Sequence, residues 1–498
     1  MFDFKNTGML RGVYPEPNAG ILRFAQDDER RAQHDVSHTF FNKLLRQTPA
    51  MYFVYSLLFV LGAIVLAPYY AWRYRKTPLL RASWRDRLGW ISARPARPGA
   101  IWVHAVSVGE TLAVAGLVEQ FAARFPGREI FISHVTPTGR EAGEKRLPQL
   151  AGRFFLPLDL AGPMRRAMRR LRPALLIIVE TELWPHLLRA AHQAGARVAL
   201  VNARLSDRSF RGYRLGRPLM RRVLENVDSI MAQTPGDAGR FREIGAAPER
   251  VEMAGNLKFD SQPPGSSQVV TALKPALAGA GRAPVLVAAS TMPGEEELVL
   301  RVWNAVRERY LQALLILVPR HPARFDQVAR LLEQQAGQGR EYIRRTALAT
   351  DGAELLRQLA RPSVLLLDTL GELQSVFELA DVVFIGGSLV PTGGHNLLEP
   401  AWWAKPVIFG PHMENFRDAA RIFLKAGGAA QVRDADDLAA EILKLFGDEA
   451  RRNAIGQAAR AIIERESGAT ARILERLAGL LGEESVSSQP SQLASEAR

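Results

Sequence analysis

Three carboxylates of the N-terminal half follow apolar segments, where functional side chains can gather. Glu110 ends the run HAVSVGE, in which an apolar segment gives way to a Ser- and Gly-containing loop and then to a helical stretch. Glu180 and Glu182 end a second apolar segment, in the run VETELWP. A carboxylate at a helix N-terminus is stabilised as the anion, which is the state that accepts a proton. Helix-start chemistry or a solvated acid is the alternative, and spacing alone leaves both interpretations open.

Two cations are placed where they can meet an anionic ligand. Lys258, in the run GNLKFD, lies where the N-terminal half passes into the C-terminal half, and its ammonium can act as a point charge against a phosphate or carboxylate. A surface lysine in a linker is the plain alternative. Arg320, in the run VPRHP, follows Pro319 at the end of an apolar segment, where a guanidinium can bind a phosphate.

Two loops of the C-terminal half have the composition of a nucleotide site. The run DTLGEL contains Gly371, Glu372 and Leu373, and its backbone can meet a base or a ribose. The run GGSLVPTGGHNLLEP leads from a buried segment through glycines into a helix expected to begin near Asn396. Glycines let the backbone approach a phosphate, and a helix start offers free N–H donors. Neither run is a Walker loop or a GxGxxG fingerprint, so ATP hydrolysis and hydride transfer lose support.

The elements that must position these residues alternate between short apolar strands and helical stretches. This alternation predicts an α/β fold with parallel sheets covered on both faces. The candidate strands are 100–105, 129–136, 153–158, 174–180, 196–202, 229–233 and 250–254, and, after a Pro-, Gly- and Ser-rich stretch at 261–267, 285–290, 314–319, 364–368, 382–387 and 406–410. We therefore predict two Rossmann-like domains facing across a cleft. Ligands of such sheets bind at the carboxyl ends of the strands, where the residues above lie.

Charge is distributed unevenly along the chain. The formal net charge is +14, and residues 73–260 contain 32 Lys and Arg against 17 Asp and Glu. Arginines recur at helical spacing at 204, 208, 211, 214 and 217, and cluster at 165, 166, 169, 170 and 172. An excess of this kind indicates an anionic partner, either nucleic acid or anionic lipid. The chain has no cysteine, which excludes disulfides, thiolate metal sites and a cysteine nucleophile.

An uncharged segment, PAMYFVYSLLFVLGAIVLAPYYAW, decides between the two partners. It is long enough to cross a hydrocarbon core, and Tyr and Trp gather at its ends. Residues 73–97 after it hold eight Lys and Arg against one Asp, which places the body of the protein on the cytoplasmic side. We therefore expect a retained anchor and no nucleic-acid partner. Pro68 leaves open whether the anchor spans the bilayer or lies tilted at its interface.

These patterns predict six regions. We expect residues 1–50 to be a non-native or disordered extension, with Met51 as the natural start, and 51–72 to be the anchor. We expect residues 73–260 to form an N-terminal Rossmann-like domain, 261–284 a linker, 285–482 a C-terminal Rossmann-like domain, and 483–498 a disordered tail rich in Ser, Gln and Glu.

Taken together, these motifs resemble those of the 3-deoxy-D-manno-octulosonic acid (Kdo) transferases of Gram-negative lipopolysaccharide assembly. The resemblance extends from Met51 to about Gly482 and includes every run quoted above, in order, followed by FGPHMENF. It implies a GT-B fold and an inverting glycosyltransferase that moves Kdo from CMP-Kdo to a phosphorylated lipid A precursor (lipid IVA). The location that it implies is the cytoplasmic face of the inner membrane, with a single N-terminal anchor at the anionic membrane surface.

The resemblance also implies a role for each motif. Glu110 is the general base on the acceptor hydroxyl, and Glu180 and Lys258 support the transition state. The residues that hold CMP are Pro319, Arg320, Gly371, Glu372, Leu373, Asn396, Leu397, Leu398 and Glu399. No cofactor and no metal ion are expected, because the single phosphate of CMP can leave without one. Two alternatives remain at this point: a two-domain epimerase of nucleotide sugars, and a non-catalytic scaffold that docks on the membrane and senses a nucleotide.

Overall fold

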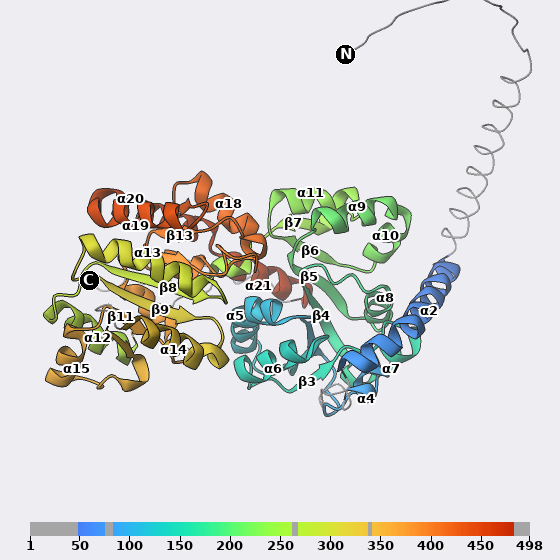
Figure 1. The fold of residues 1–498 in the computed structure, drawn as a ribbon. Helices are drawn as coiled ribbons and strands as arrows, with labels where there is room; N and C mark the ends of the chain where they lie inside the picture. Colours follow the sequence, from blue (N-terminus) through green and yellow to red (C-terminus); the bar gives the residue numbers. More distant parts are fainter. Residues whose placement is uncertain (1–47, 75–82, 261–266, 337–340, 483–498) are drawn as a thin grey trace, which may run out of the picture.

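The computed structural model describes residues 48–74, 83–260, 267–336 and 341–482 (Figure 1). Within these ranges the chain forms two seven-stranded sheets with strand orders β3-β2-β1-β4-β5-β6-β7 and β10-β11-β9-β8-β12-β13-β14. All strand pairs given for both sheets are parallel. The predicted α/β class with two doubly wound halves is therefore confirmed. Of the predicted extension 1–50, residues 48–50 are helical and the remainder lies outside the described residues, as does the tail after 482.

The first sheet contains every strand predicted for the N-terminal half. Its strands are β1 (Ala100–His104), β2 (Ile130–His134), β3 (Gly152–Phe155), β4 (Pro173–Val179), β5 (Arg197–Ala203), β6 (Ser229–Ala232) and β7 (Val251–Met253). The helices between them are α5 (Val108–Arg124), α6 (Pro137–Arg146), α7 (Ala161–Leu171), α8 (Pro185–Gln193), α9 (Asp207–Leu215), α10 (Arg217–Leu224) and α11 (Pro235–Glu243). Four of these helices begin shortly after a strand end, at the N-caps Ser107, Thr136, Ser206 and Thr234, whose side chains accept a backbone N–H of the first turn.

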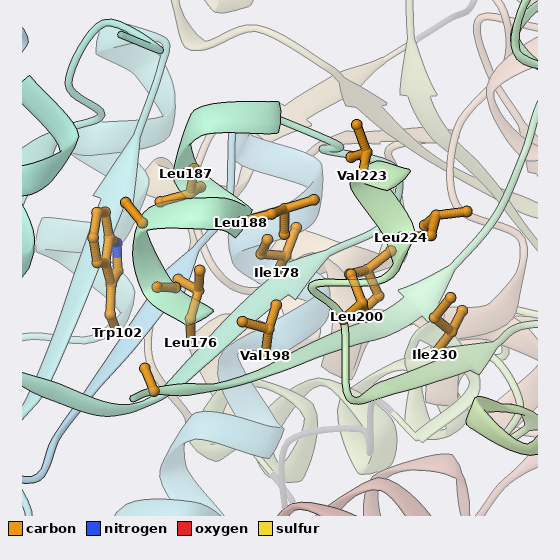
Figure 2. Close-up of a cluster of buried hydrophobic side chains, with 14 of the residues drawn as sticks. Trp102, Leu176, Ile178, Leu187, Leu188, Val198, Leu200, Val223, Leu224 and Ile230 are labelled. Carbon is orange, nitrogen blue, oxygen red and sulfur yellow. The ribbon is translucent and has the colours of Figure 1, made fainter. Parts of the chain in front are cut away.

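The core of this half lies on both faces of its sheet. Figure 2 shows one face, where side chains of β1, β4, β5 and β6 pack against Leu187 and Leu188 of α8 and against Val223 and Leu224 of α10. Strand β4 has five consecutive residues, from Leu175 to Val179, that are at most 2% exposed. A strand buried on both faces has an apolar run rather than an alternating pattern, which is the signal that located it in the sequence.

The second sheet contains two strands that the sequence did not reveal. Its strands are β8 (Val285–Thr291), β9 (Leu314–Pro319), β10 (Tyr342–Arg344), β11 (Val364–Leu366), β12 (Val382–Ile385), β13 (Val407–Phe409) and β14 (Ala429–Gln431). The α-helices of this half that precede α21 are α12 (Gln268–Gly279), α13 (Glu295–Arg309), α14 (Phe325–Ala336), α15 (Gly352–Ala360), α16 (Leu373–Val376), α17 (Leu398–Trp402), α18 (Arg417–Lys425), α19 (Ala435–Gly447) and α20 (Glu449–Glu466). The missed strands, β10 and β14, have three residues each and lie at the two edges of the sheet.

Two helices do not pack as the predicted region boundaries imply. Helix α12 lies inside the predicted linker 261–284, and its Leu273 and Leu277 are buried in the core of the second half. Helix α21 (Ala469–Leu480) lies inside the predicted second domain, yet its Ile473 and Leu477 are buried among side chains of the first sheet. The C-terminal helix therefore returns to the N-terminal half.

Hydrogen bonds between distant segments fix this return. The carboxylate of Asp260 accepts the backbone N–H groups of Gly468, at 2.6 Å, and of Thr470. The guanidinium Nε of Arg472 donates to the carbonyl oxygen of Ala254 at 2.8 Å. The end of the first half, which carries Lys258, is thus held by the start of α21.

Helix α2 (Thr48–Tyr74) precedes both sheets. Its segment Ala50–Pro68 has a mean hydropathy of 2.3, and 11% of it is buried, so this helix is apolar enough to anchor the protein in a membrane. Figure 1 shows α2 beside the first half, on the side that faces away from the second half. A short helix, α4 (Trp84–Arg87), follows it.

Candidate functional site

Glu110 is the third residue of α5 and is 9% exposed. Its Oε2 accepts the backbone N–H of Val106 at 2.7 Å, and its Oε1 accepts the hydroxyl of Ser107 at 2.8 Å. Ser107 Oγ in turn accepts the backbone N–H of Glu110 at 3.4 Å. This exchange between an N-cap serine and a carboxylate in the first turn is a variant of the capping box, in which the carboxylate accepts the N–H before the N-cap. Glu110 therefore starts the helix, and its carboxylate is at the same time held in a single position at the carboxyl end of β1.

Glu110, Glu180 and Glu182 form a cluster of carboxylates that influence one another. Burial, together with the charges of Glu110 and Glu180, raises the pKa of Glu182 to about 7. Burial also raises the pKa of Glu110, against its hydrogen bonds, and the charge of Glu180 adds to this effect. Trp184 Nε1 donates to Glu182 Oε2 at 2.9 Å. A buried group of acids costs free energy unless it binds a ligand. Perturbed pKa values of this kind are typical of functional sites.

Glu180 stands at the end of β4 in a backbone conformation that few side chains adopt. Its φ is +61°, in the left-handed region, although it is not a glycine. Strain of this kind is typical of residues whose side chain must point in a required direction. Its Oε1 lies 3.9 Å from Nζ of Lys258, and both side chains are partly exposed.

A network of side-chain amides positions the segment that carries Lys258. The amide oxygen of Asn202 accepts the N–H of Leu257 at 3.0 Å, and the amide oxygen of Asn256 accepts the N–H of Lys258 at 3.0 Å. Gln233 joins the two, because its Nε2 donates to the carbonyl of Asn202 at 2.9 Å and its Oε1 accepts Asn256 Nδ2 at 3.1 Å. Sequence reasoning missed these three residues. Asn202 and Gln233 end two predicted strands, which is the signal that could have found them.

Lys258 links the first half to the second. Its Nζ lies 5.8 Å from the centre of the Phe416 ring, which belongs to the short helix η6 (Glu414–Phe416) of the second half. An ammonium at this distance from an aromatic face is attracted to it. The predicted site residues of the first half, Glu110, Glu180 and Lys258, are therefore brought together, and the third of them reaches the other half.

The three predicted CMP segments lie near one another around Glu399. Glu399 Oε1 accepts Asn396 Nδ2 and Gln374 Nε2, each at 3.0 Å, so the loop before α17 is joined to α16, the helix after Gly371. Burial raises the pKa of Glu399, and the charge of Arg320 partly opposes this rise. Arg320 follows β9, its backbone N–H donates to Thr291 O at 3.0 Å, and its side chain is exposed. A guanidinium is thus free for an anion beside these loops.

The remaining predicted residues contribute in different ways. Gly371 has a φ of +86°, so only a glycine fits this turn without strain. The carboxylate of Glu372 accepts Thr369 Oγ1 at 2.7 Å and pairs with Arg345 Nε at 3.2 Å. The side chains of Leu397 and Leu398 are buried in the core, so these two residues offer only backbone atoms to a ligand. The side chain of Leu373 packs against the same core. Pro319 ends β9 and is buried. Helix α17 has five residues and begins at Leu398, two residues after the predicted start near Asn396.

The N–H groups at the start of the glycine-rich loop are already bonded within the protein. The carboxylate of Glu295, the first residue of α13, accepts the backbone N–H groups of Gly387, Ser388 and Leu389 at 2.6, 3.1 and 3.0 Å. It also accepts the N–H of Met292 at 3.1 Å. Glu295 was not singled out from the sequence. It acts as an internal anion for this loop, so a phosphate must be bound by other groups.

Replacing Glu295 by Ala is expected to destabilise the protein by about 3 kcal/mol, because it leaves several buried N–H groups without an acceptor. Urea unfolding measures this change. Glu297, exposed in the same first turn, provides the matched control, and Glu297→Ala is expected to change stability by less than about 0.5 kcal/mol. Equal effects of the two substitutions would show that Glu295 does not hold the loop.

Comparisons with known proteins point in one direction. Residues 82–261 match a family model described as 3-deoxy-D-manno-octulosonic-acid transferase (kdotransferase). A 3-deoxy-D-manno-octulosonic acid transferase of Bordetella pertussis is 38% identical over 434 residues, which cover 84% of this chain and 97% of that protein. Its counterpart in Haemophilus influenzae is 33% identical over 429 residues, covering 86% of this chain and 97% of that protein.

A solved structure gives the same fold. A crystal structure of UDP-N-acetylglucosamine 2-epimerase has a TM-score of 0.51 and 14% identity, and covers 79% of this chain and 99% of that one. At this identity the likeness concerns the fold alone. The relatives at 33% and 38% identity extend over almost their whole length and include both halves of the site. On this basis the chain belongs to the 3-deoxy-D-manno-octulosonic acid transferase family.

Proposed function

We propose that this protein transfers Kdo from CMP-Kdo to a phosphorylated lipid A precursor, lipid IVA, with inversion at the anomeric carbon. Membership of the family supports the transfer of Kdo. The observation that carries the mechanism is the buried carboxylate of Glu110, held at the carboxyl end of β1 beside Glu180 and Glu182. Direct displacement requires a base for the acceptor and a bound leaving group opposite to it, and the two halves supply these separately.

The proposed reaction is a single displacement. An acceptor hydroxyl gives its proton to Glu110 while its oxygen attacks the anomeric carbon of Kdo. The bond from that carbon to the phosphate oxygen breaks, and CMP leaves with the electron pair. Lys258 and Glu180 support the charge that develops in the transition state, and Arg320 faces the phosphate of CMP. The segments 371–373 and 396–399 hold the nucleotide.

The basic first half and the apolar helix α2 indicate where the reaction takes place. Residues 73–260 have an excess of positive charge, and α2 is apolar enough to anchor the protein. We propose that the protein works at the cytoplasmic face of the inner membrane, where the phosphorylated acceptor and anionic lipids meet the basic surface. Neither nucleic acid nor a cofactor is part of this proposal. Among the described residues, no group of three or more acidic or histidine side chains is placed to hold a metal ion.

Transfer in vitro tests the proposal. The purified protein is incubated with CMP-Kdo and a tetraacylated lipid A precursor, and the mass of the product is measured by mass spectrometry. We expect the acceptor to gain the mass of one or more Kdo units, and CMP to be released in equal number. An inert protein with this pair, together with interconversion of UDP-N-acetylglucosamine, would favour the epimerase alternative and overturn the proposal.

The pH dependence of transfer is expected to report the environment of Glu110. Burial raises the pKa of this group above its usual value of 4.5, and the charge of Glu180 contributes. A protonated Glu110 cannot accept a proton, so kcat/KM falls as the pH drops through this raised pKa. Removing the charge of Glu180 lowers the pKa of Glu110, so Glu180→Gln is expected to move the acid limb to lower pH.

Rates measured between pH 4 and 9 check this expectation, whatever the absolute rate of the variant. Glu119→Gln, on the same helix but paired with Arg146 at the surface, is the control and is expected to keep the wild-type profile. An unchanged acid limb in Glu180→Gln would show that Glu180 does not act on the base.

A further inference from the structure

Helix α2 consists of two parts with different surroundings. Met51 and Tyr52, in its first turns, are 2% and 3% exposed and are covered by the first half. Further along, the apolar side chains point away from the protein. The large hydrophobic residues that are at least half exposed after Ser56 are Leu58, Leu61, Ile64 and Val65, and Phe53 in the first turns is also exposed. The beginning of the helix is thus docked on the body, and the rest is free to meet another apolar phase.

The docked part is held by polar contacts with α8 and the loop before α7. Tyr55 donates its hydroxyl to Asp159 Oδ2 at 2.9 Å. Asp159 is 1% exposed and also accepts the N–H groups of His186 and Leu187 at 3.1 and 2.8 Å. Ser56 Oγ and Nε2 of His186 lie 2.8 Å apart. Burial raises the pKa of Asp159 to about 6, which shows how far this carboxylate is withdrawn from water.

A second set of contacts surrounds Tyr52. The guanidinium of Arg189 lies 4.2 Å from the centre of its ring, and Asn226 Nδ2 donates to its hydroxyl at 3.4 Å. Withdrawing α2 would leave the buried Asp159 and His186 without these partners, which is costly for buried polar groups. The first turns of α2 therefore belong to the fold of the body.

From these contacts we infer that α2 does not cross the bilayer but lies within the leaflet that faces the body. This inference rests on the proposed function only in taking a membrane as the place of action. If α2 crossed the bilayer with its C-terminal end next to the body, Tyr52 and Tyr55 would be on the opposite side of the membrane from Asp159. That arrangement breaks every contact just described.

The helix also cannot cross with its N-terminal end next to the body, because the chain after it would then have to cross back through the bilayer. The helix ends at Tyr74, and the body resumes at Ser83, which is 2% exposed. A chain of this length spans at most about 32 Å when fully extended, and a hydrocarbon core is about 30 Å thick. The connecting residues include Arg75, Lys76 and Arg81, and cations are disfavoured inside a bilayer. Both ends of α2 are therefore on the side of the body.

The surface beside α2 is complementary to an anionic bilayer. Figure 1 shows α4, α7, α8 and α10 on the same side of the first half as α2. Exposed arginines on and beside these helices and on α9 include Arg165, Arg169, Arg208, Arg211, Arg214 and Arg217. The exposed apolar side chains Trp84, Trp90 and Leu215 lie among the same elements. Arginines beside an apolar helix favour binding of this side of the protein to an anionic membrane surface.

Single cysteines test the topology directly, because the native chain has none. Ala50→Cys marks the start of α2, and Glu449→Cys, exposed in the second half, is the control for the cytoplasmic side. A membrane-impermeant maleimide is expected to label both variants in inverted vesicles and neither in intact spheroplasts. Labelling of Ala50→Cys in spheroplasts, with protection in inverted vesicles, would overturn the inference.

A cross-link decides the case in which lipid shields Ala50→Cys from both sides. The double variant Ser56→Cys with His186→Cys is treated in membranes with a short bifunctional thiol reagent, and Ser56→Cys with Glu449→Cys is the matched control. We expect an intramolecular cross-link only in the first pair, and its absence in membranes would contradict the docked helix. Neither measurement depends on Kdo transfer, so a failure of the proposed function and a failure of this inference are distinguishable.

Discussion

Glu110→Gln is expected to lower kcat for Kdo transfer by about 10²- to 10⁴-fold, the range associated with loss of a general base. Glutamine has nearly the same shape as glutamate and can still accept from Val106 N–H or Ser107 Oγ, which now hold the carboxylate at 2.7 and 2.8 Å. It cannot take the proton of the acceptor hydroxyl. The proposed nucleotide-binding residues lie on the second half, so the affinity for CMP is expected to stay the same.

The two readouts are initial rates with CMP-Kdo and the lipid acceptor, and calorimetric titration with CMP. Glu110 also belongs to a capping box, and loss of such a cap costs about 1 kcal/mol, so urea unfolding must accompany the kinetics. Glu119→Gln, on the solvent side of the same helix, is expected to leave the rate unchanged. If Glu110→Gln keeps the wild-type rate and CMP affinity, Glu110 is only the cap of α5, and Glu182 becomes the next candidate for the base.

Most strands of the first sheet could be predicted because they are short apolar runs, although β3 and β7 are not. In β4, for example, the pattern Leu-Leu-Ile-Ile-Val is buried on both faces, so the sequence contains a continuous signal with a clear end at Glu180. The polar residues that follow such runs are candidates for the site because the functional side chains of parallel sheets gather at the carboxyl ends of the strands.

The missed strands lack that signal. β10 is Tyr-Ile-Arg and is half-buried, and β14 is Ala-Ala-Gln with its last residue exposed. Each pairs with only one neighbour, so its position is determined by the sheet it joins rather than by its own composition. Helix α21 illustrates the same point, because its apolar face is evident in the sequence but the sheet that covers it is not.

The supporting contacts of the site depend on residues far apart in the chain. Asn202, Gln233 and Asn256 come from three separate segments, and Glu295 meets a loop more than 90 residues later. Each is an ordinary polar residue in its local sequence. Only the three-dimensional arrangement shows that the amides position Lys258 and that the glycine-rich loop has an internal anion.

Lys258→Met is expected to lower kcat by about 10²- to 10³-fold, the effect of removing one fixed electrostatic group from a transition state. The ammonium lies 3.9 Å from Glu180 Oε1 and 5.8 Å from the Phe416 ring, so it is held between the two halves of the protein. Methionine keeps most of the volume and removes the charge. Steady-state kinetics with CMP-Kdo and lipid acceptor measure kcat and KM separately.

Lys274→Met is the matched control, because Lys274 pairs at 2.8 Å with Glu378 on the surface and is 63% exposed. It is expected to change kcat by less than about twofold, since exposed ion pairs contribute little. Asn256→Ala removes the amide that accepts the N–H of Lys258 without touching the ammonium. This variant is expected to lower kcat by a smaller factor than Lys258→Met, through a less well positioned lysine.

The division of the effect between kcat and KM identifies the role of Lys258. A charge that acts only in the transition state lowers kcat and leaves KM unchanged, whereas a charge that binds the donor equally in both states raises KM alone. A rise in KM alone would place Lys258 among the donor-binding residues and would contradict its proposed role in the transition state. Because Lys258 contacts Phe416, a fall in both kcat and CMP affinity would instead indicate that the lysine holds the two halves in the reactive arrangement.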